Sequence, residues 1–145
     1  MTPASLQGSF IVLDASVWVS RLVSQDEFHE ATKAWMEEQH EGGVHFISPA
    51  LLLAEVGGVI SRRTGDPKLA KRVIAQLESL PGLRLVEMDN ELMGVAASLA
   101  AELGLRGGDS IYVAVAHQLN LPFVTFDADQ RERAQVRVSI QSIGE

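Results

Sequence analysis

The sequence contains no cysteine, so disulfide bonds, thiolate ligands for a metal and a cysteine nucleophile are all excluded. It also has no apolar run near the roughly 20 residues that a membrane-spanning helix needs, and we expect no membrane association. The first residues have neither the charged start nor the apolar stretch of a signal peptide. Together these absences predict a protein of the reducing cytoplasm.

Positive charge is scarce as well. The chain has 12 Lys and Arg against 19 Asp and Glu, which gives a formal net charge of −7. Proteins that bind nucleic acid usually carry a basic surface, so the overall charge alone argues against such a partner. Any contact with RNA would have to rely on local groups of cations.

What the sequence does have is enough apolar material for one core. Of its 145 residues, 46% are hydrophobic, which suits a globular α/β protein. We expect residues 1–9 to form a flexible N-terminal tail and residues 10–145 to form a single domain.

Short apolar runs alternate with segments of helical periodicity along the chain. The runs predict strands at residues 10–13, 45–47, 83–86, 123–126 and, as an edge strand, 137–140. The segments between them predict helices that begin near residues 16, 26, 50, 68, 89, 109 and 129, the first of them capped by Ser16. Strands separated by helices pair in parallel. The sequence therefore predicts a three-layer α/β/α sandwich around a central, mainly parallel sheet of four to five strands.

Four acidic residues stand at positions where such a fold would bring them together. Asp14 follows the first strand, Asp127 follows the run at 123–126, Asp109 opens an apolar helix, and Glu55 interrupts an apolar helical face. Ligands of open α/β sheets bind outside the carboxyl ends of the strands, so we expect Asp14 and Asp127 to share that edge. Asp109, at a helix start, can face the same edge.

Each acid also has a purely structural interpretation. Asp14, Asp109 and Asp127 could cap turns or helices, and Glu55 could pair with a surface arginine. Asp129, two residues past Asp127, could join the cluster or could be the N-cap of the last helix. The joint pattern of all these acids is harder to explain in this way than any one of them.

A cluster of carboxylates has a definite electrostatic consequence. Two like charges about 4 Å apart repel by about 4 kcal/mol at an effective dielectric constant near 20. Either some carboxylates are protonated or a cation neutralises them. Sites made only of oxygen ligands suit hard cations such as Mg²⁺ or Mn²⁺, which can orient a water for attack on phosphorus and stabilise the leaving oxygen. The cluster therefore predicts phosphodiester hydrolysis.

The chain resembles the PIN-domain ribonucleases, especially the VapC-type toxins of bacterial and archaeal toxin–antitoxin pairs. Four segments carry the resemblance, in the order that the family has them: IVLDAS at 11–16, SPALLLAEVGGVI at 48–60, LRGGDSIYVAVA at 105–116, and PFVTFDADQ at 122–130. The resemblance implies a metal-dependent endoribonuclease with an acidic pocket for one or two Mg²⁺ or Mn²⁺ ions. It also implies an RNA substrate, a cognate antitoxin and a homodimer.

The resemblance also implies roles for particular residues. It maps Asp14, Glu55, Asp109 and Asp127 onto the acidic quartet of the family. In this interpretation Asp14 and Asp109 hold the metal directly, Asp127 acts through a water or a second ion, and Glu55 orients the attacking water or binds metal. The family carries a further acid in some members where Asp129 stands, and hydroxyls that support the pocket where Ser16 and Thr125 stand. Ser110 replaces the alanine that many members have after the third acid, a small change.

Two pairs of arginines are candidates for RNA contact. Arg62 and Arg63 lie near one predicted helix junction, and Arg131 and Arg133 lie near Asp127, although a solvated helix face explains each of them as well. Two other functions remain open: a housekeeping PIN-domain nuclease without an antitoxin, and a partner-binding module with little catalysis. A phospho-acceptor domain is disfavoured, because residues 122–130 lack the lysine that such domains need.

Overall fold

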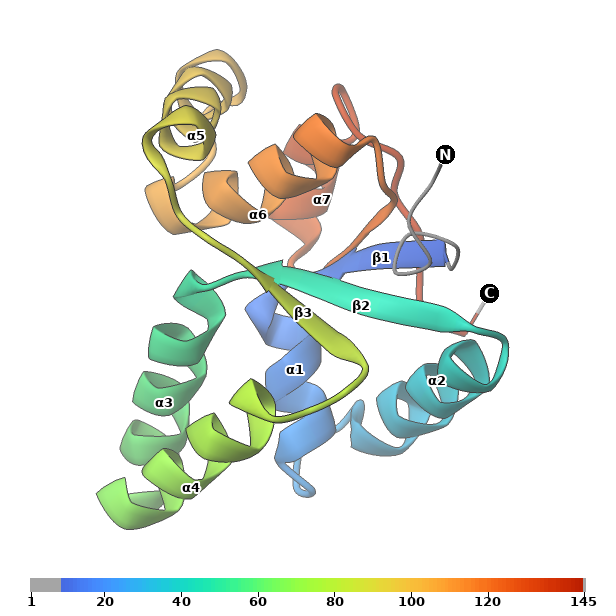
Figure 1. Cartoon of the computed structure of the whole chain (residues 1–145), viewed down its shortest axis with the longest axis vertical. Helices are drawn as coiled ribbons and strands as arrows, with labels where there is room; N and C mark the ends of the chain where they lie inside the picture. Colours follow the sequence, from blue (N-terminus) through green and yellow to red (C-terminus); the bar gives the residue numbers. More distant parts are fainter. Residues whose placement is uncertain (1–8, 145) are drawn as a thin grey trace.

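A computed structural model describes residues 9–144, so the predicted N-terminal tail lies almost wholly outside the described residues. Its centre is a four-stranded sheet in the order β3-β2-β1-β4, in which every neighbouring pair is parallel. The strands are β1 (Ser9–Leu13), β2 (Val44–Pro49), β3 (Leu83–Val86) and β4 (Phe123–Val124). The predicted parallel α/β/α architecture is confirmed (Figure 1).

Helices cover both faces of this sheet. They are α1 (Ala15–Leu22), α2 (His29–Glu41), α3 (Leu51–Thr64), α4 (Pro67–Glu78), α5 (Asn90–Leu103), α6 (Gly107–Leu119) and α7 (Ala128–Ala134). Figure 1 shows α1 to α4 below the sheet and α5 to α7 above it. Among the described residues, no helix is both long and apolar enough to cross a membrane.

The central strands supply side chains to two separate cores. In β1, Ile11 and Leu13 pack into the core under α1 to α4, whereas Val12 packs into the core under α5 and α6. In β2, Phe46 and Ile47 divide in the same way. Successive strand residues point to opposite faces, so a strand buried on both sides is apolar throughout. This explains why continuous apolar runs marked these strands in the sequence.

Three local predictions were wrong. Helix α1 is capped by Asp14 and not by Ser16, because the Asp14 carboxylate accepts the Ser16 N–H. The Ser16 hydroxyl instead accepts the N–H of Phe126. Helix α2 begins at His29, after a turn that Asp26 closes by accepting the Phe28 N–H.

The predicted edge strand at 137–140 was wrong as well, since it contracts to one parallel bridge between Phe123 and Ile140. Its neighbour β4 has only two residues and therefore offers almost no strand to pair with. Two backbone hydrogen bonds join this segment to β4: the Phe123 N–H donates to the Ser139 carbonyl, and the Gln141 N–H donates to the Phe123 carbonyl.

Candidate active site

Asp14 occupies the innermost position of the site. It follows β1 directly and is only 6% exposed. Its Oδ2 accepts hydrogen bonds from the backbone N–H of Ser16 at 3.2 Å and from the hydroxyl of Thr125 at 3.1 Å. Both donors are neutral, so they orient the carboxylate without cancelling its charge.

A buried polar network ties Asp14 to the segment after β4. The hydroxyl of Thr125 lies 3.0 Å from Oε1 of Gln130 and accepts the N–H of Asp127 at 3.1 Å. One hydroxyl proton serves only one acceptor at a time, so Asp14 and Gln130 share it. Gln130 is 1% exposed, and its amide also donates to the backbone carbonyl of Asp109 at 3.4 Å. The network thus positions three acids relative to one another.

Asp109 and Asp127 form the outer part of the site, and one guanidinium joins them. Nε of Arg106 lies 2.9 Å from Oδ2 of Asp109, and Nη2 lies 2.7 Å from Oδ2 of Asp127. Asp109 stands in the first turn of α6, and Asp127 caps α7 by accepting the Gln130 N–H. The two acids are 21% and 29% exposed, whereas the arginine is 73% exposed. An exposed cation therefore bridges the two outer acids.

Glu55 reaches the site from α3. The Tyr112 hydroxyl donates to its Oε1 at 2.5 Å. Burial raises the pKa of Glu55 above its ordinary value; the bond from Tyr112 opposes this rise, and the charges of Asp14 and Asp109 add to it. A Cβ on Gly108 would lie 3.6 Å from Oε2 of Glu55, so the start of α6 adjoins this carboxylate.

Electrostatic repulsion from the neighbouring acids also shifts the pKa of Asp109. Burial raises the pKa of Asp109 most strongly, Arg106 lowers it by its hydrogen bond and charge, and Asp14 and Asp127 raise it again. Burial is therefore the main reason why the pKa of Asp109 is raised despite the bound guanidinium, and the neighbouring acids add to it. The structure thus couples Asp14, Glu55, Asp109 and Asp127 through their charges.

The other predicted residues lie around this group. Ser16 and Thr125 belong to the buried network, their hydroxyls 3.5 Å apart.

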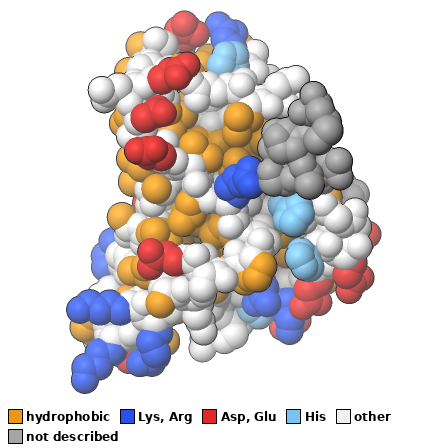
Figure 2. Space-filling view, viewed as in Figure 1, with side chains coloured by type: hydrophobic (Ala, Val, Ile, Leu, Met, Phe, Trp, Pro, Cys, Tyr) orange, Lys and Arg blue, Asp and Glu red, His pale blue; other side chains and the backbone are white. Residues whose placement is uncertain are grey.

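Asp129 is 69% exposed and pairs with Arg133, on the outside of α7. Two of the other predicted arginines have partners of their own: Arg63 lies 3.9 Å from Asp26, and Arg131 donates to the Thr125 carbonyl. Figure 2 shows Lys and Arg gathered at the lower left, over the α3–α4 junction where Arg62 and Arg63 end α3.

The chemistry of these side chains fits a hard divalent cation, although their present arrangement favours Arg106. All the acids offer oxygen ligands, and two of them already share one cation. Within residues 9–144, however, no three acidic or histidine side chains converge closely enough to hold an ion. The guanidinium occupies the space between Asp109 and Asp127 that a metal bound to both would need.

Comparison with known proteins decides the family. A sequence model of the PIN domain matches residues 11–136. The chain belongs to the PIN-domain family. No curated protein gives a significant match to it.

Solved structures support the fold of this PIN domain. VapC20 of Mycobacterium tuberculosis, described as a toxin that cleaves the sarcin-ricin loop, is 19% identical, with a TM-score of 0.72 over 84% of this chain and 93% of that chain. VapBC2 from Rickettsia felis, bound to a DNA fragment from its promoter, is 12% identical, with a TM-score of 0.72 over 92% and 98%. FitAcB from Neisseria gonorrhoeae is 23% identical, with a TM-score of 0.66 over 90% and 95%.

Three residues of this PIN domain's site escaped the sequence analysis. Arg106 stands three positions before Asp109, which is contact spacing on a helix, so its ion pair could have been anticipated. Tyr112 lies one turn after Asp109 on α6, but nothing in the sequence aligns it with Glu55, 57 positions away. Gln130 gave no signal, because its burial depends on the way α7 folds back onto Thr125.

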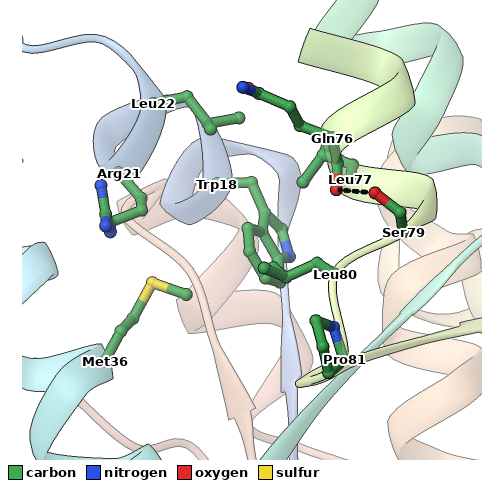
Figure 3. Close-up of a pocket in the computed structure, with 9 residues that line it drawn as sticks. All are labelled: Trp18, Arg21, Leu22, Met36, Gln76, Leu77, Ser79, Leu80 and Pro81. Atoms are coloured by element: carbon green, nitrogen blue, oxygen red, sulfur yellow. Dashed lines mark hydrogen bonds between the residues drawn. The ribbon is translucent and has the colours of Figure 1, made fainter.

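The PIN domain also has an apolar groove that none of these acids lines. It encloses about 430 Å³ between α1, α2, α4 and the turn before β3. Figure 3 shows its lining: Trp18, Arg21, Leu22, Met36, Gln76, Leu77, Ser79, Leu80 and Pro81. Leu80 is 41% exposed there, which leaves apolar surface open to solvent.

Proposed function

We propose that this PIN domain is a metal-dependent endoribonuclease and the toxin of a toxin–antitoxin pair. One observation carries the proposal: four carboxylates from four different elements interact through their charges next to the carboxyl end of β1, and two of them already share a cation. A fold gains nothing in stability from such repulsion. Family membership and the match to VapC20 in fold point to RNA as the substrate.

We assign Asp14 and Asp109 to direct metal binding and Asp127 to binding through a water or a second ion. A bound Mg²⁺ or Mn²⁺ would supply charge for the phosphate oxygens and a lowered pKa for a bound water. Thr125 and Ser16 hold Asp14 in place through the bonds described above. Asp129 and the arginines Arg62, Arg63, Arg131 and Arg133 remain candidates for further metal or RNA contacts.

Glu55 is the residue that we propose as the base. Its raised pKa brings it closer to neutral pH, which makes its carboxylate a better acceptor for the proton of an attacking water. The Tyr112 hydroxyl holds one oxygen of this carboxylate by donating to Oε1, so Oε2 is the atom left to receive that proton. The water oxygen would join the phosphorus as one P–O bond breaks, the water proton would pass to Glu55, and the leaving ribose oxygen would take a proton from solvent.

An antitoxin is the partner that we propose for the groove in Figure 3. Its exposed apolar lining suits a hydrophobic protein segment. Related folds occur in toxin–antitoxin complexes, such as one from Klebsiella pneumoniae with a TM-score of 0.56. We also propose a homodimer in the cytoplasm. Purification from the native source tests the partner: an antitoxin should accompany the chain, whereas a chain that always emerges alone would indicate a housekeeping nuclease.

Cleavage of total cellular RNA tests the enzymatic proposal. Purified protein, shown to be folded and free of partner, is incubated with EDTA, Mg²⁺ or Mn²⁺ beside the Asp109→Asn variant. We expect discrete products that need metal and that the variant does not make. Absence of cleavage in every metal, together with no measurable metal affinity, would overturn the proposal and leave the partner-binding function.

A further inference from the structure

Arg106 is placed like a cation that belongs to the acidic site. Its guanidinium presents two N–H groups of one planar fork to two different carboxylates, Oδ2 of Asp109 at 2.9 Å and Oδ2 of Asp127 at 2.7 Å. These bonds and the charge of Asp109 raise the pKa of Arg106, so it stays protonated at any physiological pH. In this state one guanidinium offsets one of the two negative charges, and the acid pair keeps a net charge of about −1.

Little besides these two contacts holds the arginine. Its side chain is 73% exposed, and its hydrogen bonds among the described residues all go to the two carboxylates. Two neighbouring arginines differ in this respect. Arg131 donates to the backbone carbonyl of Thr125, and Arg133 donates to the backbone carbonyl of Leu103. Because exposed ion pairs are weak, the Arg106 contacts can be exchanged at small cost.

A metal ion and the guanidinium compete for the same atoms. Mg²⁺ binds carboxylate oxygens at about 2.0–2.1 Å, so an ion shared by the two Oδ2 atoms would need the space that the Arg106 N–H groups now fill. Two cations this close also repel each other. Arg106 is the N-cap residue of α6 and so remains beside the acids if it is released, and a guanidinium fork matches the oxygens of a phosphate.

We propose that Arg106 is an exchangeable counter-ion: it bridges Asp109 and Asp127 until a divalent cation displaces it, and it then binds a phosphate of the substrate RNA. This inference rests on the proposed function and deepens it. Arg106 would thus have two successive contacts. Without metal it binds Asp109 and Asp127, and after the metal enters it binds a phosphate of the substrate.

Manganese affinity tests the first half, with Mn²⁺ itself as the probe and electron paramagnetic resonance as the readout. We expect Arg106→Gln to bind Mn²⁺ roughly three- to fivefold more tightly than the wild type, because the competitor is gone. Arg106→Lys should fall between the two, since an ammonium keeps the charge but lacks the fork. Arg137→Gln is the matched control: it removes the same charge from an exposed pair with Glu102 on α5, and its affinity should stay within twofold.

RNA affinity tests the second half. The probe is a fluorescein-labelled single-stranded RNA, measured by anisotropy in Ca²⁺ before any product forms, and again in EDTA. In Ca²⁺ we expect Arg106→Gln to bind this RNA roughly threefold more weakly than the wild type, with partial recovery in Arg106→Lys. In EDTA the arginine is held by the acids, so the variant and the wild type should bind alike.

The two failures are distinguishable. Wild-type Mn²⁺ affinity in Arg106→Gln would overturn the exchange while leaving the nuclease intact, provided that the wild type still cleaves RNA. An equal loss of RNA affinity in EDTA and in Ca²⁺ would show that Arg106 binds phosphate without being exchanged, and would also overturn the inference. A wild type that neither binds Mn²⁺ nor cleaves RNA would overturn the proposed function, and the inference with it.

Discussion

The two halves of the acidic site are neutralised in different ways. Asp14, 6% exposed, is surrounded by neutral donors from its own chain, the Ser16 N–H and the Thr125 hydroxyl. Asp109 and Asp127, three to five times as exposed, share the guanidinium of Arg106. Neutral donors fix the direction of a carboxylate and leave its charge for a ligand, whereas a guanidinium cancels that charge until it is removed.

This difference suggests a division of labour. In the proposed function the buried half would hold one metal ligand, Asp14, in a fixed orientation, because its donors come from α1 and from the segment after β4. The outer half changes state, because its cation is held only by exposed contacts. A rigid ligand beside an exchangeable pair is a reasonable design for a metal site that must also admit a large substrate.

Replacing Asp109 should have the largest effect. Loss of a residue that merely orients a metal ligand costs about 10–100-fold, so loss of a ligand should lower RNA cleavage at least about 100-fold in Asp109→Asn. The metal-free fold should keep or gain stability, because burial and the charges of Asp14 and Asp127 outweigh Arg106 and raise the pKa of Asp109. Cleavage rates and melting temperature in EDTA are the measurements. A lower melting temperature for the variant would contradict the electrostatic account.

Breaking the buried half should cost stability instead. Thr125→Val keeps the shape of a side chain that is 3% exposed but removes the hydroxyl shared by Asp14, Gln130 and the Asp127 N–H. We expect a loss of about 1–3 kcal/mol in the free energy of unfolding, measured with denaturant in EDTA. Thr125→Ser retains the hydroxyl and is the control. Equal stability of the valine variant and the wild type would show that this network does not fix Asp14.

The pH dependence of Glu55 should give a smaller effect. Burial raises the pKa of Glu55 in the folded state above its ordinary value of 4.5. Protonation of Glu55 therefore stabilises the fold, and this contribution is fully present below pH 4.5. It is lost as the pH rises through the pKa of the folded state. Glu55→Gln mimics the protonated form. Without metal it should melt about 1–3 °C above the wild type at pH 8, and the difference should vanish near pH 4.5. A difference that is independent of pH would mean that packing, not ionisation, distinguishes the two.

The smallest effect is expected on the outside of α7. Arg133 pairs with Asp129, which is 69% exposed, so Arg133→Gln should change the free energy of unfolding by no more than about 0.5 kcal/mol. Its Mn²⁺ affinity should also match that of the wild type, in contrast to Arg106→Gln. Denaturant unfolding and Mn²⁺ titration of both variants make the comparison. Tighter Mn²⁺ binding in Arg133→Gln would show that net charge, not the bridge, governs metal entry.

The sequence was sufficient to predict the parallel sheet and the meeting of four acids, for a physical reason. Strands buried on both faces are continuous apolar runs, and the ends of parallel strands share one edge, so Asp14 and Asp127 had to approach each other. The two-residue length of β4 and the loss of the edge strand were not predictable, because alternating residues at 137–140 look the same whether or not a partner strand exists.

The contacts between the site residues were less predictable than the identity of the acidic residues themselves. The bond from Tyr112 to Glu55 joins two helices on opposite faces of the sheet, and the burial of Gln130 depends on the packing of α7. Neither leaves a periodic signal in the sequence. A cluster of acids predicts a bound metal ion as its counter-charge. In the structure, a side chain of the protein itself, Arg106, supplies positive charge to Asp109 and Asp127.

The most direct test of the whole account is an anomalous difference map from crystals of the wild-type protein soaked in Mn²⁺. We predict a peak ligated by Asp14 and Asp109 and adjoining Asp127, with the Arg106 guanidinium turned away from both carboxylates. A map without a peak at these acids, with Arg106 still bridging Asp109 and Asp127 at saturating Mn²⁺, would contradict the account.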